Sequence, residues 1–101
     1  MTITEMKNIL VKKLADERTY FTKKDINIKK SNGGYDITIK DYECIPFRID
    51  FELDDYFGHI ILVKREDFDV EDRTIAFVDS KKDFDFETAL IELGYYIGTR
   101  F

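Results

Sequence analysis

Nucleophilic or acid–base chemistry in this sequence would depend on a single histidine. His59 is the only histidine and Cys44 is the only cysteine. Catalysis of that kind needs a nucleophile and a base within hydrogen-bonding distance of each other. None of the candidate nucleophiles, Cys44, Ser31 and Ser80, lies in a recognisable nucleophile motif. One cysteine and one histidine also cannot build a structural zinc site. We therefore expect no catalytic residue, no metal and no cofactor.

One short motif would carry metal-dependent chemistry. An apolar run over residues 75–78 ends in Asp79, and Lys81 follows two positions later. This resembles a family of metal-dependent nucleases, in which the acidic residue and an earlier aspartate hold Mg²⁺ and the lysine positions or activates the attacking water. Asp55 or Asp67 would be the earlier acid. So short a match arises often by chance when 37% of residues are charged, so nuclease activity is kept only as an alternative.

The acidic run 67–72 invites comparison with a calcium-binding loop. An EF-hand loop requires Gly at its sixth position and Glu at its twelfth. Counted from Asp67, those positions hold Asp72 and Val78, so the pattern does not fit. We expect a solvated loop here.

Aromatic residues set among carboxylates are the recurring pattern of the second half of the chain. The segments 54–57, 66–69 and 83–87 each repeat it. Loop aromatics flanked by charge can anchor a protein partner, and carboxylates on a rigid surface can take the places of phosphates in a nucleic-acid-binding groove. The alternative is that these aromatic rings fold inward as part of the core. The predicted partner-binding residues are Asp54, Asp55, Tyr56, Phe57, Asp67, Phe68, Asp69, Asp83 and Phe84.

Composition places the chain among small, highly charged globular proteins. Its 101 residues predict one domain, 1–101, and 44% apolar residues are enough for a core. The net charge is −5, unevenly divided: residues 1–48 carry ten basic and seven acidic side chains, whereas residues 49–101 carry six and fourteen. The two halves would complement each other within the fold or form opposite poles. The alternative is a solvated coat without function.

The charge also argues against nucleic-acid binding. A helix, a meander and a second helix are the order of double-stranded RNA-binding domains, whose second helix must be basic. The second helix predicted here holds Asp85, Glu87 and Glu92 and no Lys or Arg. We therefore expect no measurable binding to plain duplex DNA at physiological salt.

These features together predict a non-enzymatic protein that binds and inhibits a basic, nucleic-acid-handling protein. Phage-encoded inhibitors of bacterial defence nucleases, anti-CRISPR proteins among them, share this small, acidic composition. An immunity protein against a nuclease toxin is the alternative, because it would look the same. With one cysteine, no apolar run near the ~20 residues of a membrane helix and no signal-peptide pattern, a cytoplasmic location is expected. The oligomeric state is left open.

A helix is predicted over residues 3–18 to begin the chain. Thr2 and Glu5 have the spacing of a capping box. Apolar residues then recur at steps of three and four, which gives the helix one apolar face. That stripe consists of Ile3, Met6, Leu10 and Leu14.

Alternating patterns then predict four or five strands. Residues 25–30 and 35–40 flank Ser31-Asn32-Gly33-Gly34 and indicate a hairpin. Residues 45–53 alternate strictly, with Pro46 expected near the strand start or an edge. Residues 59–64 are apolar on both faces, as in a central strand, and residues 74–79 are a candidate fifth strand.

A second helix is predicted from Asp83 or Asp85 to about Ile97, weakened by Gly94 and stopped by Gly98. The fold class is therefore α+β: a helix, an antiparallel meander of four to five strands and a helix, with both helices on one face of the sheet. The predicted core consists of Leu10, Leu14, Ile49, Phe51, Ile61, Val63, Leu90 and Leu93.

Overall fold

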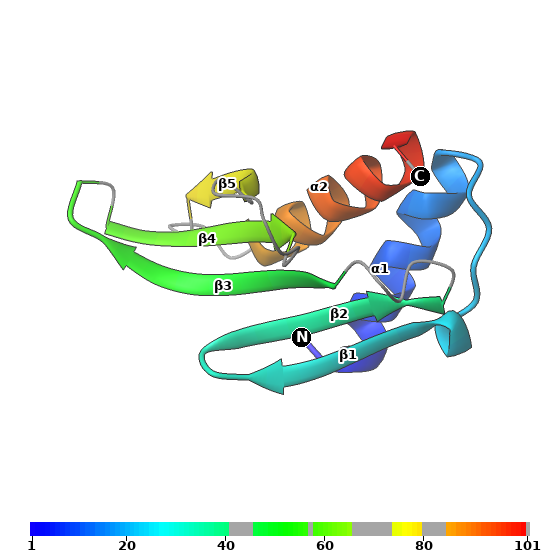
Figure 1. The fold of residues 1–101 in the computed structure, drawn as a ribbon, viewed down its shortest axis with the longest axis horizontal. Helices are drawn as coiled ribbons and strands as arrows, with labels where there is room; N and C mark the ends of the chain where they lie inside the picture. The colour runs from blue at the N-terminus through cyan, green and yellow to red at the C-terminus, as the bar shows by residue number, and fades with distance from the viewer. Residues whose placement is uncertain (41–45, 57, 66–73, 80–84, 101) are drawn as a thin grey trace.

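The computed structural model describes residues 1–40, 46–56, 58–65, 74–79 and 85–100, with side chains described except at 54, 74–79, 85 and 100. The elements follow in the order α1 (Ile3–Asp16), η1 (Lys23–Asp25), β1 (Ile26–Ser31), β2 (Gly34–Ile39), β3 (Phe47–Asp54), β4 (Gly58–Arg65), β5 (Thr74–Asp79) and α2 (Asp85–Arg100). The sheet order is β1-β2-β3-β4-β5, and every neighbouring pair is antiparallel. The predicted α+β meander between two helices is confirmed (Figure 1).

Helix α1 begins and ends with local hydrogen bonds that its sequence encodes. The Glu5 amide donates to Thr2 Oγ1 at 3.1 Å, and the Thr2 amide donates to Glu5 Oε1 at 3.2 Å, so the predicted capping box is present. At the other end Arg18 takes a left-handed conformation with φ 61°, and the Thr19 amide donates to the Leu14 carbonyl at 2.8 Å. This is a Schellman arrangement, and it stops the helix shortly before the predicted boundary.

The β1–β2 hairpin depends on two residues that accept positive φ. Asn32 and Gly33 have φ of 44° and 78° and form the two-residue turn between Ser31 and Gly34. Such a turn matches the right-handed twist of the flanking strands. A Cβ at Gly34 would overlap the Ile49 carbonyl oxygen, so β2 can approach β3 this closely only with glycine there.

The core lies between the two helices and one face of the sheet. It includes residues from α1, α2 and strands β1 to β4. Because paired residues of neighbouring strands share a face, the register places both helices on the same side of the sheet. The largest fully buried side chains are Met6, Leu10, Leu14, Ile26, Ile37, Ile39, Phe47, Ile49, Ile61, Leu90, Leu93 and Ile97.

One predicted core residue is not in the core. Phe51 is 46% exposed, so its prediction as a core residue is wrong. It lies on the same face of β3 as the buried Phe47 and Ile49, but farther along the strand, where the start of α2 covers the sheet only in part. The alternating sequence correctly identifies the face of β3 that packs against the helices. It cannot show how far along the strand the helices extend.

The second helix is longer than predicted. It continues to Arg100, so the expectation that Gly98 ends it is wrong. A Cβ at Gly94 would come within 2.8 Å of the Lys13 Cγ, and one at Gly98 would overlap the Glu17 Cβ. The two glycines therefore mark where α2 packs closely against α1. Neither helix in the described part of the chain combines the length and apolar character that crossing a membrane requires.

The β3–β4 hairpin projects past its neighbours in the sheet. Strand β2 pairs with β3 only over Phe47–Asp50, and β5 pairs with β4 only from Ile60 to Lys64. The rest of the hairpin extends as a two-stranded ribbon beyond the β1–β2 turn, at the left of Figure 1. We call the described residues of 51–59 the hairpin end.

Candidate protein-docking site

Three of the predicted partner-binding residues lie in the hairpin end. Asp54 is the last residue of β3, and Asp55 and Tyr56 form the turn that follows. Asp55 is exposed, and Tyr56 is 87% exposed. The remaining predicted residues, and the side chain of Asp54, lie outside the described residues; these are Phe57, Asp67, Phe68, Asp69, Asp83 and Phe84. The described part of the predicted site is therefore the consecutive turn residues Asp54, Asp55 and Tyr56.

The hairpin end also exposes apolar side chains that the sequence pattern assigned to the covered face. Leu53 is 72% exposed and Phe51 is 46% exposed. Leu53 pairs across the hairpin with His59, which is also exposed. Large apolar side chains exposed close together on a protein surface are typical of a site that contacts a partner.

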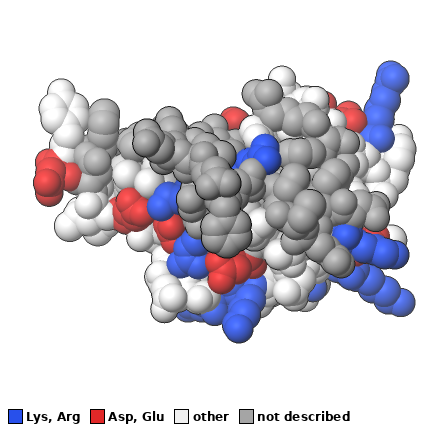
Figure 2. All heavy atoms as spheres, in the orientation of Figure 1, with Lys and Arg blue, Asp and Glu red and all other residues white. Residues whose placement is uncertain are grey.

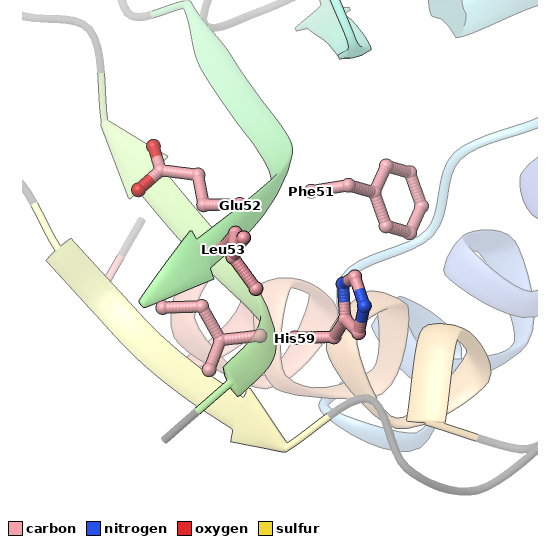
Figure 3. A pocket seen from close by; sticks show the side chains of 5 residues that line it. Phe51, Glu52, Leu53 and His59 are labelled. Carbon is pink, nitrogen blue, oxygen red and sulfur yellow. The ribbon is translucent and has the colours of Figure 1, made fainter. Parts of the chain in front are cut away.

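The surface around these residues is open, so it suits contact with another protein better than enclosure of a small ligand. Phe51, Glu52, Leu53, His59 and Ile60 line a hollow of about 340 Å³. Figure 3 shows the Phe51 and His59 side chains on one side of the hairpin and the Glu52 carboxylate on the other. The lining residues belong to both faces of the β3–β4 ribbon, so the hollow lies along the edge of the hairpin and is open to solvent. Small-molecule sites are concave and surround most of the ligand, which this one cannot do.

An aromatic cluster holds the base of the hairpin end. The Phe51 ring contacts Phe86 at the start of α2, with ring centroids 5.3 Å apart, and meets Tyr35 edge-on at 6.3 Å. Tyr35 and Phe86 stack at 5.5 Å. Aromatic pairs at such distances add about 0.5–1.5 kcal/mol beyond their buried area. The cluster fixes the direction in which the hairpin leaves the body of the protein.

Ion pairs on the open face of the sheet hold the same hairpin from the other side. Arg48 donates to Asp36 at 2.7 Å and to Asp50 at 2.5 Å, and its side chain is only 13% exposed. The same guanidinium donates to the carbonyl oxygens of Ser31 at 2.6 Å and Asn32 at 2.9 Å. One side chain of β3 therefore binds both β2 and the β1–β2 turn. Hydrogen bonds from Arg48 to Asp36 raise the pKa of the guanidinium further, against the opposing effect of its burial.

Lys64 continues this network from β4. Its ammonium lies 2.9 Å from Asp50 Oδ2 and 3.0 Å from Glu52 Oε1. Burial lowers the pKa of Lys64, but the hydrogen bonds that its ammonium donates to the two carboxylates, together with their negative charges, outweigh burial and raise the pKa above its ordinary value. Arg48 and Lys64 are therefore both paired with carboxylates within the fold. In contrast, Asp55 forms no ion pair with any described residue.

Acidic and basic side chains are unevenly distributed over the described surface. In Figure 2 acidic side chains lie at the far left, over the hairpin end, and lysines and arginines lie below and to the right, over β1 and η1. Exposed lysines of that region are Lys23, Lys24, Lys29, Lys30 and Lys40. The described residues show both features that the sequence left open: Arg48 and Lys64 pair with carboxylates within the sheet, and the acidic hairpin end lies far from the lysines of β1.

No described residues form a metal site: no group of three or more His, Cys, Asp or Glu side chains among them is placed to hold an ion. Asp79 ends β5, but its side chain and the whole of Lys81 and Cys44 lie outside the described residues. Comparison with known proteins gives no further identification, because no protein-family model, no curated protein and no solved structure matches the chain.

Proposed function

We propose that this protein is a non-enzymatic binding protein that docks through its hairpin end onto a basic surface of another protein. One observation carries the proposal: the rigidly held hairpin end exposes Phe51, Leu53 and Tyr56 beside the carboxylate of Asp55. Apolar anchors surrounded by charge of one sign are the composition of a protein-binding surface.

The apolar and acidic residues would contribute to binding in different ways. A large side chain that becomes fully buried in a partner contributes about 2 kcal/mol or more and controls the rate of release. Exposed carboxylates mainly speed the encounter with a basic partner, and salt weakens that effect. Raising the salt concentration is therefore expected to slow association more than it hastens dissociation.

The partner that best fits this chemistry is a basic protein that handles nucleic acid. Such a protein has a groove with Lys and Arg side chains placed to meet phosphates. A narrow two-stranded ribbon with an acidic turn can enter a groove of that kind and exclude the nucleic acid. Inhibition by occupation requires no chemistry from the bound protein, which agrees with the proposal of a non-enzymatic inhibitor.

The experiment compares partner capture by the wild-type protein with capture by a hairpin-end variant, Asp54→Lys with Asp55→Lys and Tyr56→Ala. Its matched control is Lys29→Glu with Lys30→Glu, a charge change of the same size and opposite sign at exposed residues of β1. Folding of each variant is checked by thermal unfolding. A partner identified by mass should bind the wild type and the control and lose affinity for the hairpin-end variant. Unchanged affinity and unchanged salt dependence in that variant would contradict the proposal.

A further inference from the structure

Strand β3 has a free edge in the hairpin end. Its last backbone hydrogen bond toward the β1–β2 hairpin runs from the Phe51 amide to the Gly33 carbonyl, at 3.3 Å. The paired register of β2 and β3 has already ended at Asp50. Beyond that point β3 continues to Asp54 and pairs with β4 only, as far as the described residues show. A strand edge of this kind is a template for another strand.

The direction of the free backbone groups follows from the alternation of a strand. Because the Phe51 amide points toward the β2 side, the amide and carbonyl of Leu53 point to the same side. The groups of Glu52, between them, point toward β4. No described strand lies opposite Leu53 on the β2 side. Leu53 therefore offers one donor and one acceptor to an incoming strand, with its side chain 72% exposed beside them.

The side chains along this edge also alternate. Phe51 and Leu53 lie on the face that the helices cover elsewhere, and Glu52 and Asp54 lie on the open face. We propose that the docked partner adds an extended segment as a strand to β3 at residues 51–54, and that this segment alternates apolar residues with Lys or Arg. Apolar residues of the segment would then lie beside Phe51 and Leu53, and its cations beside the carboxylates, because directly opposed residues share a face.

The charge disfavours a second copy of this chain as the added strand. Two β3 edges paired about Leu53 would place Glu52 of one copy opposite Asp54 of the other, and the two acidic turns would lie near the same ribbon. Like charges that are directly opposed in a sheet are destabilising. A partner strand with Lys or Arg at those positions replaces this repulsion by attraction. The inference rests on the proposed function, since it specifies how the hairpin end meets its basic partner.

The test uses a defined probe, an acetylated and amidated peptide of four Val-Arg repeats, and the complete protein labelled with ¹⁵N. We expect the Leu53 amide resonance to shift and its hydrogen exchange to slow as the peptide binds. We expect the peptide to pair antiparallel to β3, as every described strand pair of the sheet does. In that orientation the residue opposite Leu53 exchanges both hydrogen bonds with it, and that residue is a valine. N-methylation of the valines is therefore expected to weaken binding about tenfold or more, whereas N-methylation of the arginines leaves it unchanged.

Two outcomes would overturn the inference. One is equal affinity of the two methylated peptides, which would show docking by side chains alone. The other is an unchanged Leu53 amide at millimolar peptide. Neither result decides the proposed function, which the partner-capture experiment tests separately. Loss of partner binding in the Asp54→Lys, Asp55→Lys and Tyr56→Ala variant does not depend on strand addition. A Val-Glu repeat peptide is the charge control and is expected not to bind.

Discussion

Phe47 and Phe51 belong to one strand and one face of the sheet, and they differ in what covers them. Phe47 is fully buried under the helices, whereas Phe51 is 46% exposed at the start of the hairpin end. Both rings contact an aromatic residue of α2, Tyr96 for Phe47 and Phe86 for Phe51. The covered part of the sheet therefore holds the fold, and the projecting part exposes the same kind of side chain to a partner.

The largest expected effect separates these two residues directly. Phe47→Ala leaves a cavity in the core and is expected to lower the free energy of unfolding by about 3–5 kcal/mol. Phe51→Ala removes a ring that is half in water and is expected to cost about 1–2 kcal/mol. Urea denaturation of both variants gives the comparison. Equal losses would mean that the hairpin end is part of the core.

The next effect concerns the network that attaches the hairpin to the β1–β2 turn. Arg48→Met leaves the Asp36 and Asp50 carboxylates and the Ser31 carbonyl without their shared donor. We expect a loss of about 2–3 kcal/mol, because removing one partner of a partly buried network leaves the others unsatisfied. Lys64→Met is the matched control, with an expected loss of about 1 kcal/mol, since that ammonium is more exposed. If Arg48→Met lowered the free energy of unfolding less than Lys64→Met, Arg48 would not be the residue that attaches the hairpin to the β1–β2 turn.

Close packing of the helices gives a smaller effect within the covered part. Gly98→Ala introduces a Cβ that overlaps Glu17, so α1 and α2 must separate slightly. Overpacking costs about 1–3 kcal/mol, and about 1 kcal/mol is regained because Ala favours the helix more than Gly. We expect a net loss of about 1 kcal/mol by thermal unfolding. The exposed neighbour Thr99→Ala should stay within about 0.5 kcal/mol. A stabilised Gly98→Ala would show that the helices do not touch there.

Surface residues of the hairpin end should matter little for the fold. Leu53→Ser changes a side chain that is already 72% exposed and is expected to alter the free energy of unfolding by less than about 0.5 kcal/mol. The same variant should release a bound partner faster if Leu53 is an anchor. Urea denaturation and dissociation kinetics test the two parts separately. A large loss of stability would place Leu53 among the residues that hold the fold.

The smallest effect is a pH dependence at the start of α1. Hydrogen bonds from the Thr2 backbone and hydroxyl lower the pKa of Glu5 below its ordinary value, and Thr22 does the same for Asp25. Folding therefore favours the ionised carboxyls, so their contribution to stability is complete above the unfolded pKa and disappears as the pH falls through the folded pKa. An NMR titration should show the Glu5 midpoint rising in Thr2→Ala while the Asp25 midpoint stays unchanged.

Local sequence signals predicted most of the fold because the forces behind them act over a few residues. The capping box of Thr2 and Glu5 predicted the start of α1, and the Asn32-Gly33 pair predicted a tight hairpin. The strict alternation of residues 45–53 predicted β3, which the structure has at Phe47–Asp54, and its two faces. For the site, the sequence pointed to the turn at Asp54, Asp55 and Tyr56, but it did not identify Phe51 and Leu53 as exposed.

The remaining features depend on contacts between segments far apart in the chain. Gly94 and Gly98 are unfavourable in an isolated helix, and only the crossing of α1 explains why α2 continues through them. Alternation determined on which face of β3 Phe47 and Phe51 lie. The tertiary structure decided which of the two is buried, because burial depends on where β2 and the helices end and not on the strand itself.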